Sequence, residues 1–95
     1  MAGYLIARVN VTDPDKYKNY TALTPAAAQA YGGEFIVRGG ELATLEGEAE
    51  TRRVVVIRFP SVEQAHAFWN SPEYTTAKKE RVGAAEMQAI VVEGS

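Results

Sequence analysis

The chain contains no cysteine and a single histidine, His66. The absence of cysteine excludes disulfides, thiolate nucleophiles and cysteine-ligated metals. One histidine cannot form a histidine-rich metal centre, although carboxylates are able to hold a hard cation. No apolar run approaches the roughly 20 residues that span a bilayer, and the first residues lack the basic segment of a signal peptide. We therefore expect a cytoplasmic protein with no metal, no cofactor and no membrane partner.

The chain also has little excess charge of either sign. Ten basic and twelve acidic residues give a formal net charge of -2. Binding to nucleic acid or to an anionic membrane requires a clustered excess of lysine and arginine, so neither partner is expected. The hydrophobic fraction of 46% and the charged fraction of 23% are typical of a globular protein. A chain of 95 residues builds one hydrophobic core, which predicts a single domain over residues 1–95.

Hydrophobic periodicity divides the chain into four strands and two helices. Alternation with a period of two predicts a strand over 4–11. Asp13 as an N-cap, followed by Pro14, predicts a helix to Tyr31, which Pro25 should kink or split near Thr24. Residues 42–45 either extend the second strand or form a separate edge piece. The remaining elements are strands over 34–38, 52–59 and 87–92, and a helix that begins at 60–61, breaks at 71–72 and continues over 72–81.

This order of elements, β-α-β-β-α-β, predicts the fold. Right-handed crossovers place both helices on the same face of one four-stranded antiparallel sheet. The expected fold class is therefore α+β, with the ferredoxin-like arrangement.

Sorting the strand residues by parity separates two faces of this sheet. The first set is entirely apolar and should lie under the helices: Leu5, Ala7, Val9, Val11, Phe35, Val37, Val55, Ile57, Phe59, Met87, Ala89 and Val91. The second set is mixed, and its apolar members are Ile6, Ile36, Val54, Val56, Ile90 and Val92. The chain has no further element to cover this second face, and exposed apolar patches of this size mark interaction sites. We expect a homodimer in which two copies of the face pack together.

Arg8, Arg38 and Arg58 come from three strands and share the parity of the mixed face. A guanidinium keeps its proton in a protein, so its burial requires an anionic partner or water. One interpretation leaves the arginines in solvent or pairs them, within or between subunits, with Glu34, Glu41, Glu46 or Glu50. The other is a small cavity where they bind the carboxylate or enolate of a small organic ligand, oriented by Asn10 and Gln88.

The helices carry the remaining candidates. Histidine is the side chain that titrates near neutrality, so His66 is either a general acid or base or, one position off the apolar stripe, a surface or rim residue. The aromatic residues either pack the helices on the sheet or extend their polar tips to a pocket mouth: Trp69, Tyr74, Tyr17, Tyr20 and Tyr31.

Several short motifs together resemble one known family. They are Arg38-Gly39-Gly40, Leu45-Glu46-Gly47, Val55-Val56-Ile57-Arg58-Phe59-Pro60-Ser61, Ala65, Phe68-Trp69, Ser71-Pro72-Glu73-Tyr74 and Arg81. This combination resembles the domain of unknown function 1330 family, within the dimeric α+β barrel superfamily, over nearly the whole chain. The resemblance implies a ferredoxin-like subunit that pairs sheet to sheet into a barrel.

The resemblance also implies a range of functions. Relatives in the superfamily include cofactor-independent quinone-forming monooxygenases, muconolactone isomerases, chlorite dismutase-like haem proteins and stress-induced barrel proteins. A single histidine does not favour the haem branch. Matched onto this chain, the family pattern points to five candidate pocket or scaffold residues: Arg38, Glu46, Trp69, Tyr74 and Arg81.

These observations leave two classes of function open. The first is an oxygenase or isomerase that needs no cofactor and acts on a small anionic or enolisable molecule in a pocket between sheet and helices. Arg38 and Arg58 would stabilise developing negative charge, and His66 or Tyr74 would move a proton. The other ligand-binding candidates are Arg8, Asn10 and Trp69. The alternative is a non-catalytic dimer with a ligand-binding, stress-related or structural role.

Overall fold

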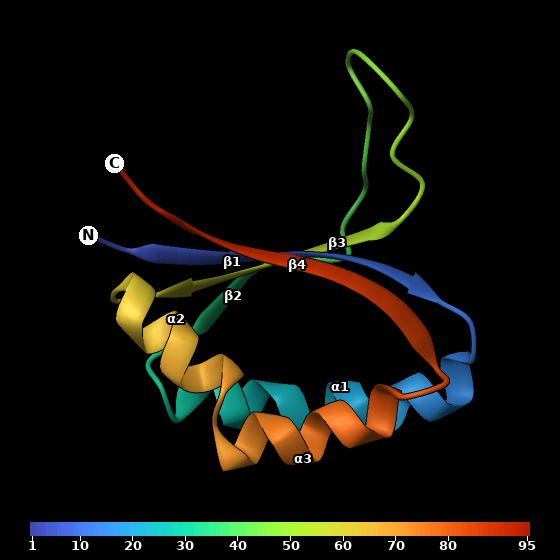
Figure 1. Cartoon of the computed structure of the whole chain (residues 1–95). Helices are drawn as coiled ribbons and strands as arrows, with labels where there is room; N and C mark the ends of the chain where they lie inside the picture. The colour runs from blue at the N-terminus through green and yellow to red at the C-terminus, as the bar shows by residue number, and fades with distance from the viewer.

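The computed structural model describes all 95 residues, and its elements follow the predicted order. They are β1 (Gly3–Val11), α1 (Pro14–Gln29), β2 (Glu34–Arg38), β3 (Arg53–Phe59), α2 (Val62–Trp69), α3 (Pro72–Arg81) and β4 (Ala85–Glu93). The strands form one antiparallel sheet in the order β2-β3-β1-β4. All three helices lie on one side of this sheet (Figure 1). The predicted ferredoxin-like α+β fold is confirmed.

Capping residues set the helix starts, as the sequence predicts. The side chains of Asp13 and Ser61 each accept a hydrogen bond from a backbone N–H of the first turn of α1 and α2. Ser71 separates α2 from α3. Its hydroxyl donates to the carbonyl of Phe68 at 2.7 Å and accepts from the backbone N–H of Tyr74 at 3.0 Å. This buried link fixes the position of Tyr74 at the start of α3.

Helix α1 continues through Pro25, so the predicted split near Thr24 is wrong. Proline has no N–H, which leaves the carbonyl of Thr21 without its usual helical donor. Packing on both sides of the proline compensates, because each half of the helix buries side chains against the core. The buried residues of α1 are Tyr17, Tyr20, Thr24, Ala27 and Ala28.

Cross-strand pairing confirms most of the apolar face under the helices. In the central strand β1, Leu5 pairs with Ile57 on one side and with Val91 on the other. Residues of this parity join the helices in a core of 15 buried side chains. The largest side chains that are fully buried there are Tyr74, Phe59, Phe68 and Val9.

Strand β2 contains a β-bulge at Ile36 that reverses the parity of the residues after it. Phe35 pairs with Ile57, and Arg38 pairs with Val55. The two β2 residues are three positions apart, whereas their partners are two positions apart, so one extra residue lies between the two pairs. Because both β3 partners face the helices, Arg38 also lies on the helix side of the sheet.

The bulge corrects two predicted placements. Arg38 does not share a face with Arg8 and Arg58, because the extra residue moves it to the helix side. Val37 pairs with Val56 on the opposite side and is 39% exposed, so its predicted place under the helices is wrong.

The sheet side away from the helices, here called the open face, has no part of the chain packed flat upon it (Figure 1). Its exposed large apolar residues are Ile36, Val37, Ile90 and Val92. Residues 39–52, here called the arm, project from the same side between β2 and β3 (Figure 1). Residues 42–45 lie in the arm, so they neither extend β2 nor form a separate edge strand, the two alternatives that the sequence predicts. Leu45 is 96% exposed.

None of the helices combines the length and the apolar character needed to cross a lipid bilayer.

Candidate functional site

A cavity of about 400 Å³ lies between the sheet and the helices. Eleven of its sixteen lining residues are hydrophobic, so its walls are mainly apolar. The sheet contributes Leu5, Val55 and Ile57, and the helices contribute aromatic side chains. A volume of this size is in the range of sites for small organic ligands. The cavity occupies the side of the sheet on which a catalytic pocket was predicted.

Two arginines line this cavity, Arg38 at the end of β2 and Arg53 at the start of β3. Arg53 pairs with Val9, which places it on the helix side. The guanidinium carbon of Arg38 lies 4.4 Å from the centre of the Phe35 ring. The Arg53 guanidinium packs against Gly39, whose φ is 68°, and a β-carbon at this position would overlap it. Glycine therefore supplies both the backbone conformation and the space for Arg53.

The positive charge of these arginines is not balanced inside the cavity. None of the lining residues is acidic, and neither Arg38 nor Arg53 forms an ion pair. The Nε atom of Arg53 is buried and has no hydrogen-bond partner. Because a guanidinium retains its charge and only donates hydrogen bonds, the cavity is cationic with unfilled donors.

Three tyrosines from α1 and α3 line the helix side of the cavity. The hydroxyl oxygens of Tyr20 and Tyr74 lie 2.8 Å apart, and both side chains are buried. Burial raises the pKa of Tyr20, and the Tyr74 phenol raises it further. Burial also raises the pKa of Tyr17, although the Arg53 guanidinium opposes this shift. Tyr17 and Tyr20 therefore remain protonated at neutral pH, so each is available as a hydrogen-bond donor and not as a base.

Trp69 closes the aromatic wall next to these tyrosines. Its ring lies 4.9 Å from that of Tyr74, and the ammonium of Lys78 lies 5.0 Å from the indole centre. The sequence predicts that Trp69 and Tyr74 either pack the helices on the sheet or line a pocket. In the structure each residue does both, because it packs in or against the core and also lines the cavity.

Several predicted site residues lie outside the cavity. His66 is exposed on α2 and does not line it, so the structure does not bring this histidine and Tyr74 together at one site. Arg58 is exposed on the open face, and Glu46 lies in the arm. Arg81 packs over the ring of Tyr20 at 5.8 Å but is not a lining residue. No cluster of histidine and carboxylate side chains able to hold a metal ion is present.

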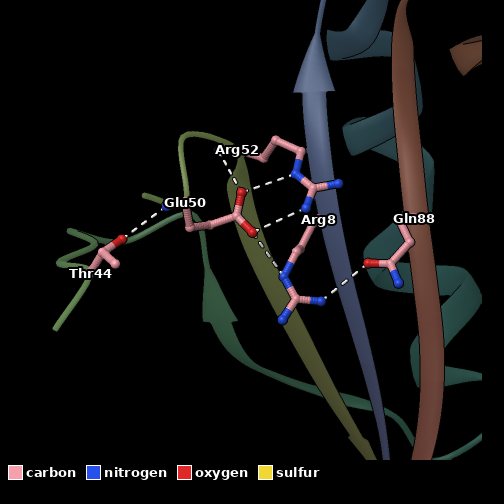
Figure 2. Close-up of polar contacts among 5 residues, drawn as sticks. All are labelled: Arg8, Thr44, Glu50, Arg52 and Gln88. Atoms are coloured by element: carbon pink, nitrogen blue, oxygen red, sulfur yellow. Dashed lines mark hydrogen bonds and ion pairs between the residues drawn. The ribbon is translucent and has the colours of Figure 1, made fainter. Parts of the chain in front are cut away.

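Arg8 lies on the open face within a polar network that anchors the arm (Figure 2). Its Nε contacts Glu50 Oε1 at 3.0 Å, and its Nη1 donates to Gln88 Oε1 at 3.1 Å. Arg52 also donates to both carboxylate oxygens of Glu50, from Nε at 2.9 Å and from Nη2 at 3.1 Å. The backbone N–H of Glu50 donates to Thr44 Oγ1 at 2.9 Å. For Arg8, this geometry matches the interpretation as a structural pair with a glutamate.

Asn10 and Gln88, predicted to orient a ligand, also belong to the open face. Asn10 is exposed and lines a polar hollow together with Gln88 and Arg52. Gln88 orients the Arg8 guanidinium. Neither amide reaches the cavity on the helix side.

Sequence reasoning missed Arg53, although a signal for it exists. Arg53 has the parity of Val55 and Ile57 in the same strand, so continuing the alternation by one more step places it under the helices. The contact between Tyr20 and Tyr74 joins residues 54 positions apart and has no local signal in the sequence.

Comparisons with known proteins agree with the fold. The family described as "Domain of unknown function (DUF1330)" matches residues 2–95. No curated protein matches the chain.

Solved structures with similar folds are distant in sequence. A protein of unknown function from Rhodopseudomonas palustris is 21% identical with a TM-score of 0.72, over 99% of this chain and 82% of that one. A dimeric ferredoxin-like protein of unknown function from Jannaschia sp. CCS1 is 16% identical with a TM-score of 0.74, over 99% and 100%. SnoaB from Streptomyces nogalater, described as a cofactor-independent oxygenase, is 12% identical with a TM-score of 0.70, over 99% and 93%. At these identities the likeness is one of fold.

The Glu50 network predicts a specific pH dependence of stability. The hydrogen bonds from the Arg52 side chain and backbone lower the pKa of Glu50 from 4.5 to about 2. Since the folded state favours the ionised carboxyl, its contribution is complete above pH 4.5 and is lost as the pH falls through about 2. We expect Glu50→Gln to unfold at lower urea concentration than the wild type at pH 7, with a difference that shrinks between these two pH values. Glu46→Gln, in the same arm but without an ion pair, is the control. If the urea midpoints of Glu50→Gln and the wild type differ by the same amount at every pH, the lowered pKa of Glu50 is contradicted.

Proposed function

Because the chain belongs to the DUF1330 family, whose description assigns no activity, we propose a function from the cavity itself. The cavity binds a small planar organic anion, either a carboxylate or the enolate of an enolisable compound. The anionic group lies against the guanidinium groups of Arg53 and Arg38, and the planar body lies between apolar and aromatic walls.

The unbalanced charge of the cavity supports this proposal most directly. Two arginines and no acidic residue line it, and the buried Nε of Arg53 has no partner within the protein. Planar guanidinium groups match the geometry of carboxylate and enolate oxygens, and charge-assisted bonds of this kind are among the stronger ones in proteins. An anionic ligand fills the donors that the fold leaves open.

The remaining lining fits a flat hydrophobic body. Phe35, Trp69 and the tyrosines present aromatic surfaces, and Leu5 with Val55 forms an apolar floor. About 400 Å³ is sufficient for a molecule with one or two fused rings.

A catalytic use of this site is the stabilisation of an enolate. Arginines that bind an enolate more tightly than its neutral form lower the free energy of deprotonation, which is the step that cofactor-independent oxygenation and isomerisation share. The carbon–hydrogen bond breaks, its electron pair moves to the enolate oxygen beside the arginines, and the proton passes to water, because the lining has no carboxylate, histidine or lysine to accept it. SnoaB, a structure of similar fold, is described as such an oxygenase. The alternative is binding without conversion, which the absence of aspartate, glutamate, histidine and lysine from the lining favours.

We further propose that two copies of the chain associate through their open faces. Ile6, Val56 and Ile90 form an apolar surface there that no element of the chain covers. The arm projects from the same side (Figure 1) and carries Leu45, which is 96% exposed and available for contact with a second copy. The similar structure from Jannaschia sp. CCS1 is described as dimeric.

The proposed anion site predicts how matched probes bind. We expect 2-naphthoate to bind and the neutral 2-naphthamide to bind at least tenfold more weakly, as measured by titration calorimetry. Arg53→Gln should weaken naphthoate binding by about 10- to 100-fold, because it removes a charge-assisted bond. Arg58→Gln, which changes an exposed arginine on the open face, is the matched control and should bind as the wild type does. Equal binding of acid and amide would contradict the proposal.

Enolate stabilisation predicts a shift in the titration of a bound dione. We expect the apparent pKa of 1-phenyl-1,3-butanedione, followed by ultraviolet absorbance, to fall by about one unit or more on binding to the wild type. The same measurement with Arg53→Gln should give the value of the free compound. If the dione binds without any shift, the site is a binder and not a catalyst of enolisation.

The proposed dimer predicts the effect of charge on the open face. Ile90 is 44% exposed in the subunit, so Ile90→Glu should fold normally yet shift the protein to monomer in sedimentation at micromolar concentration. Val82, which is 65% exposed at the end of α3, offers the control Val82→Glu, which should remain dimeric. A wild-type protein that sediments as a monomer would rule out the dimer.

A further inference from the structure

The buried hydroxyl pair of Tyr20 and Tyr74 has one hydrogen-bond donor more than the protein uses. The two oxygens lie 2.8 Å apart, and each hydroxyl carries one proton. Only one of the two protons lies in the bond between them. The other group that hydrogen-bonds these hydroxyls is the Arg81 guanidinium, which donates and cannot accept, so the second proton has no acceptor in the protein.

The surroundings of the pair supply further donors and no charged acceptor. Arg81 lies 5.8 Å from the centre of the Tyr20 ring, and its Nε is buried without a partner. A guanidinium cannot accept a hydrogen bond, and its positive charge strengthens a nearby phenol as a donor. Burial and the Tyr74 phenol raise the pKa of Tyr20, so this hydroxyl keeps its proton at neutral pH. Both tyrosines line the cavity, and no lining residue is acidic.

We propose that the Tyr20–Tyr74 pair uses its second O–H to donate a hydrogen bond to a neutral carbonyl oxygen of the ligand. The cavity then recognises two groups on one molecule, an anionic group at Arg53 and a separate carbonyl group at the tyrosine pair. The substrate class is a planar oxo-acid, such as an aryl carboxylate that carries a ketone. This inference rests on the proposed function, because it places the second group relative to the proposed anion site.

The physical basis of the selectivity is the cost of an unsatisfied donor. A ligand of the same shape with an alkyl group in place of the carbonyl leaves the tyrosine proton buried without a partner. A ligand with the carbonyl satisfies the donor. The difference expected for one neutral hydrogen bond is about three- to tenfold in dissociation constant.

Matched ligand pairs test this inference. The probes are 3- and 4-acetylbenzoate, each compared with the corresponding isopropylbenzoate, which has a similar shape and no carbonyl. In the wild type we expect at least one acetylbenzoate to bind about three- to tenfold more tightly than its isopropyl counterpart, by titration calorimetry. In the double variant Tyr20→Phe/Tyr74→Phe, the ratio of the two dissociation constants should fall to one. The isopropylbenzoates should bind to this variant at least as tightly as to the wild type.

The double variant preserves the packing that the measurement requires. Replacing both partners of a buried hydrogen bond with apolar groups of the same shape is close to neutral for stability, and thermal unfolding verifies that the variant is folded. Tyr31→Phe is the control, because the Tyr31 hydroxyl donates to Glu73 at 3.1 Å and this residue does not line the cavity. It should keep the wild-type ratio. The single variants Tyr20→Phe and Tyr74→Phe then identify which hydroxyl donates to the ligand.

The outcomes separate this inference from the function on which it rests. Equal binding of both members in each pair to the wild type overturns the inference and leaves the anion site intact. A ratio that persists in the double variant also overturns it. If none of the four carboxylates binds, the proposed anion site itself fails, and the inference fails with it.

Discussion

The cavity depends on one electrostatic constraint, the placement of the Arg53 guanidinium on the helix side of the sheet without a carboxylate partner. A guanidinium cannot become neutral, so a half-buried one carries a desolvation cost that water or an anion must offset. The fold maintains this arrangement through two local features, the bulge at Ile36 and the glycine at position 39. The bulge adds Arg38 to the same side, and the glycine leaves space for Arg53. Together they concentrate positive charge at one end of a largely apolar cavity.

On the open face, by contrast, the charge of the central arginine is paired. Arg8 has Glu50 and Gln88 as partners, and Arg52 holds the same carboxylate in a bidentate contact (Figure 2). Burying an ion pair is costly, but burying an unpaired charge costs far more. A face whose central arginine is already paired is therefore suited to contact with another protein surface. The two sides of one sheet thus differ in chemistry, with paired charge on one side and unpaired charge on the other.

The sequence predicts the fold well because its signals are local and repeat along each element. Alternation identifies β1, a run of β-branched residues over 54–57 identifies β3, and the caps Asp13, Ser61 and Ser71 mark the helix starts. The prediction fails where a single residue changes the register, because the bulge in β2 reverses every parity after Ile36. The helix also does not split at Pro25, because burial on both sides of the proline outweighs one lost hydrogen bond. The sequence predicts Arg38 and Trp69 as site residues, and both line the cavity, but its parity places Arg38 on the wrong face of the sheet.

The distribution of charge also limits how two copies can meet. Arg58 lies on the open face near the end of β3, between Tyr4 and Glu34 of the neighbouring strands, and forms no ion pair within the subunit. If it were buried at the centre of an interface, its desolvation would oppose association, so a stable dimer must leave it at the rim or pair it with a carboxylate of the second copy. The arm carries acidic side chains, including Glu46 and Glu48, on the same side of the sheet. An arrangement in which the arm of one copy reaches the Arg58 end of the other satisfies both the apolar surface and this remaining charge.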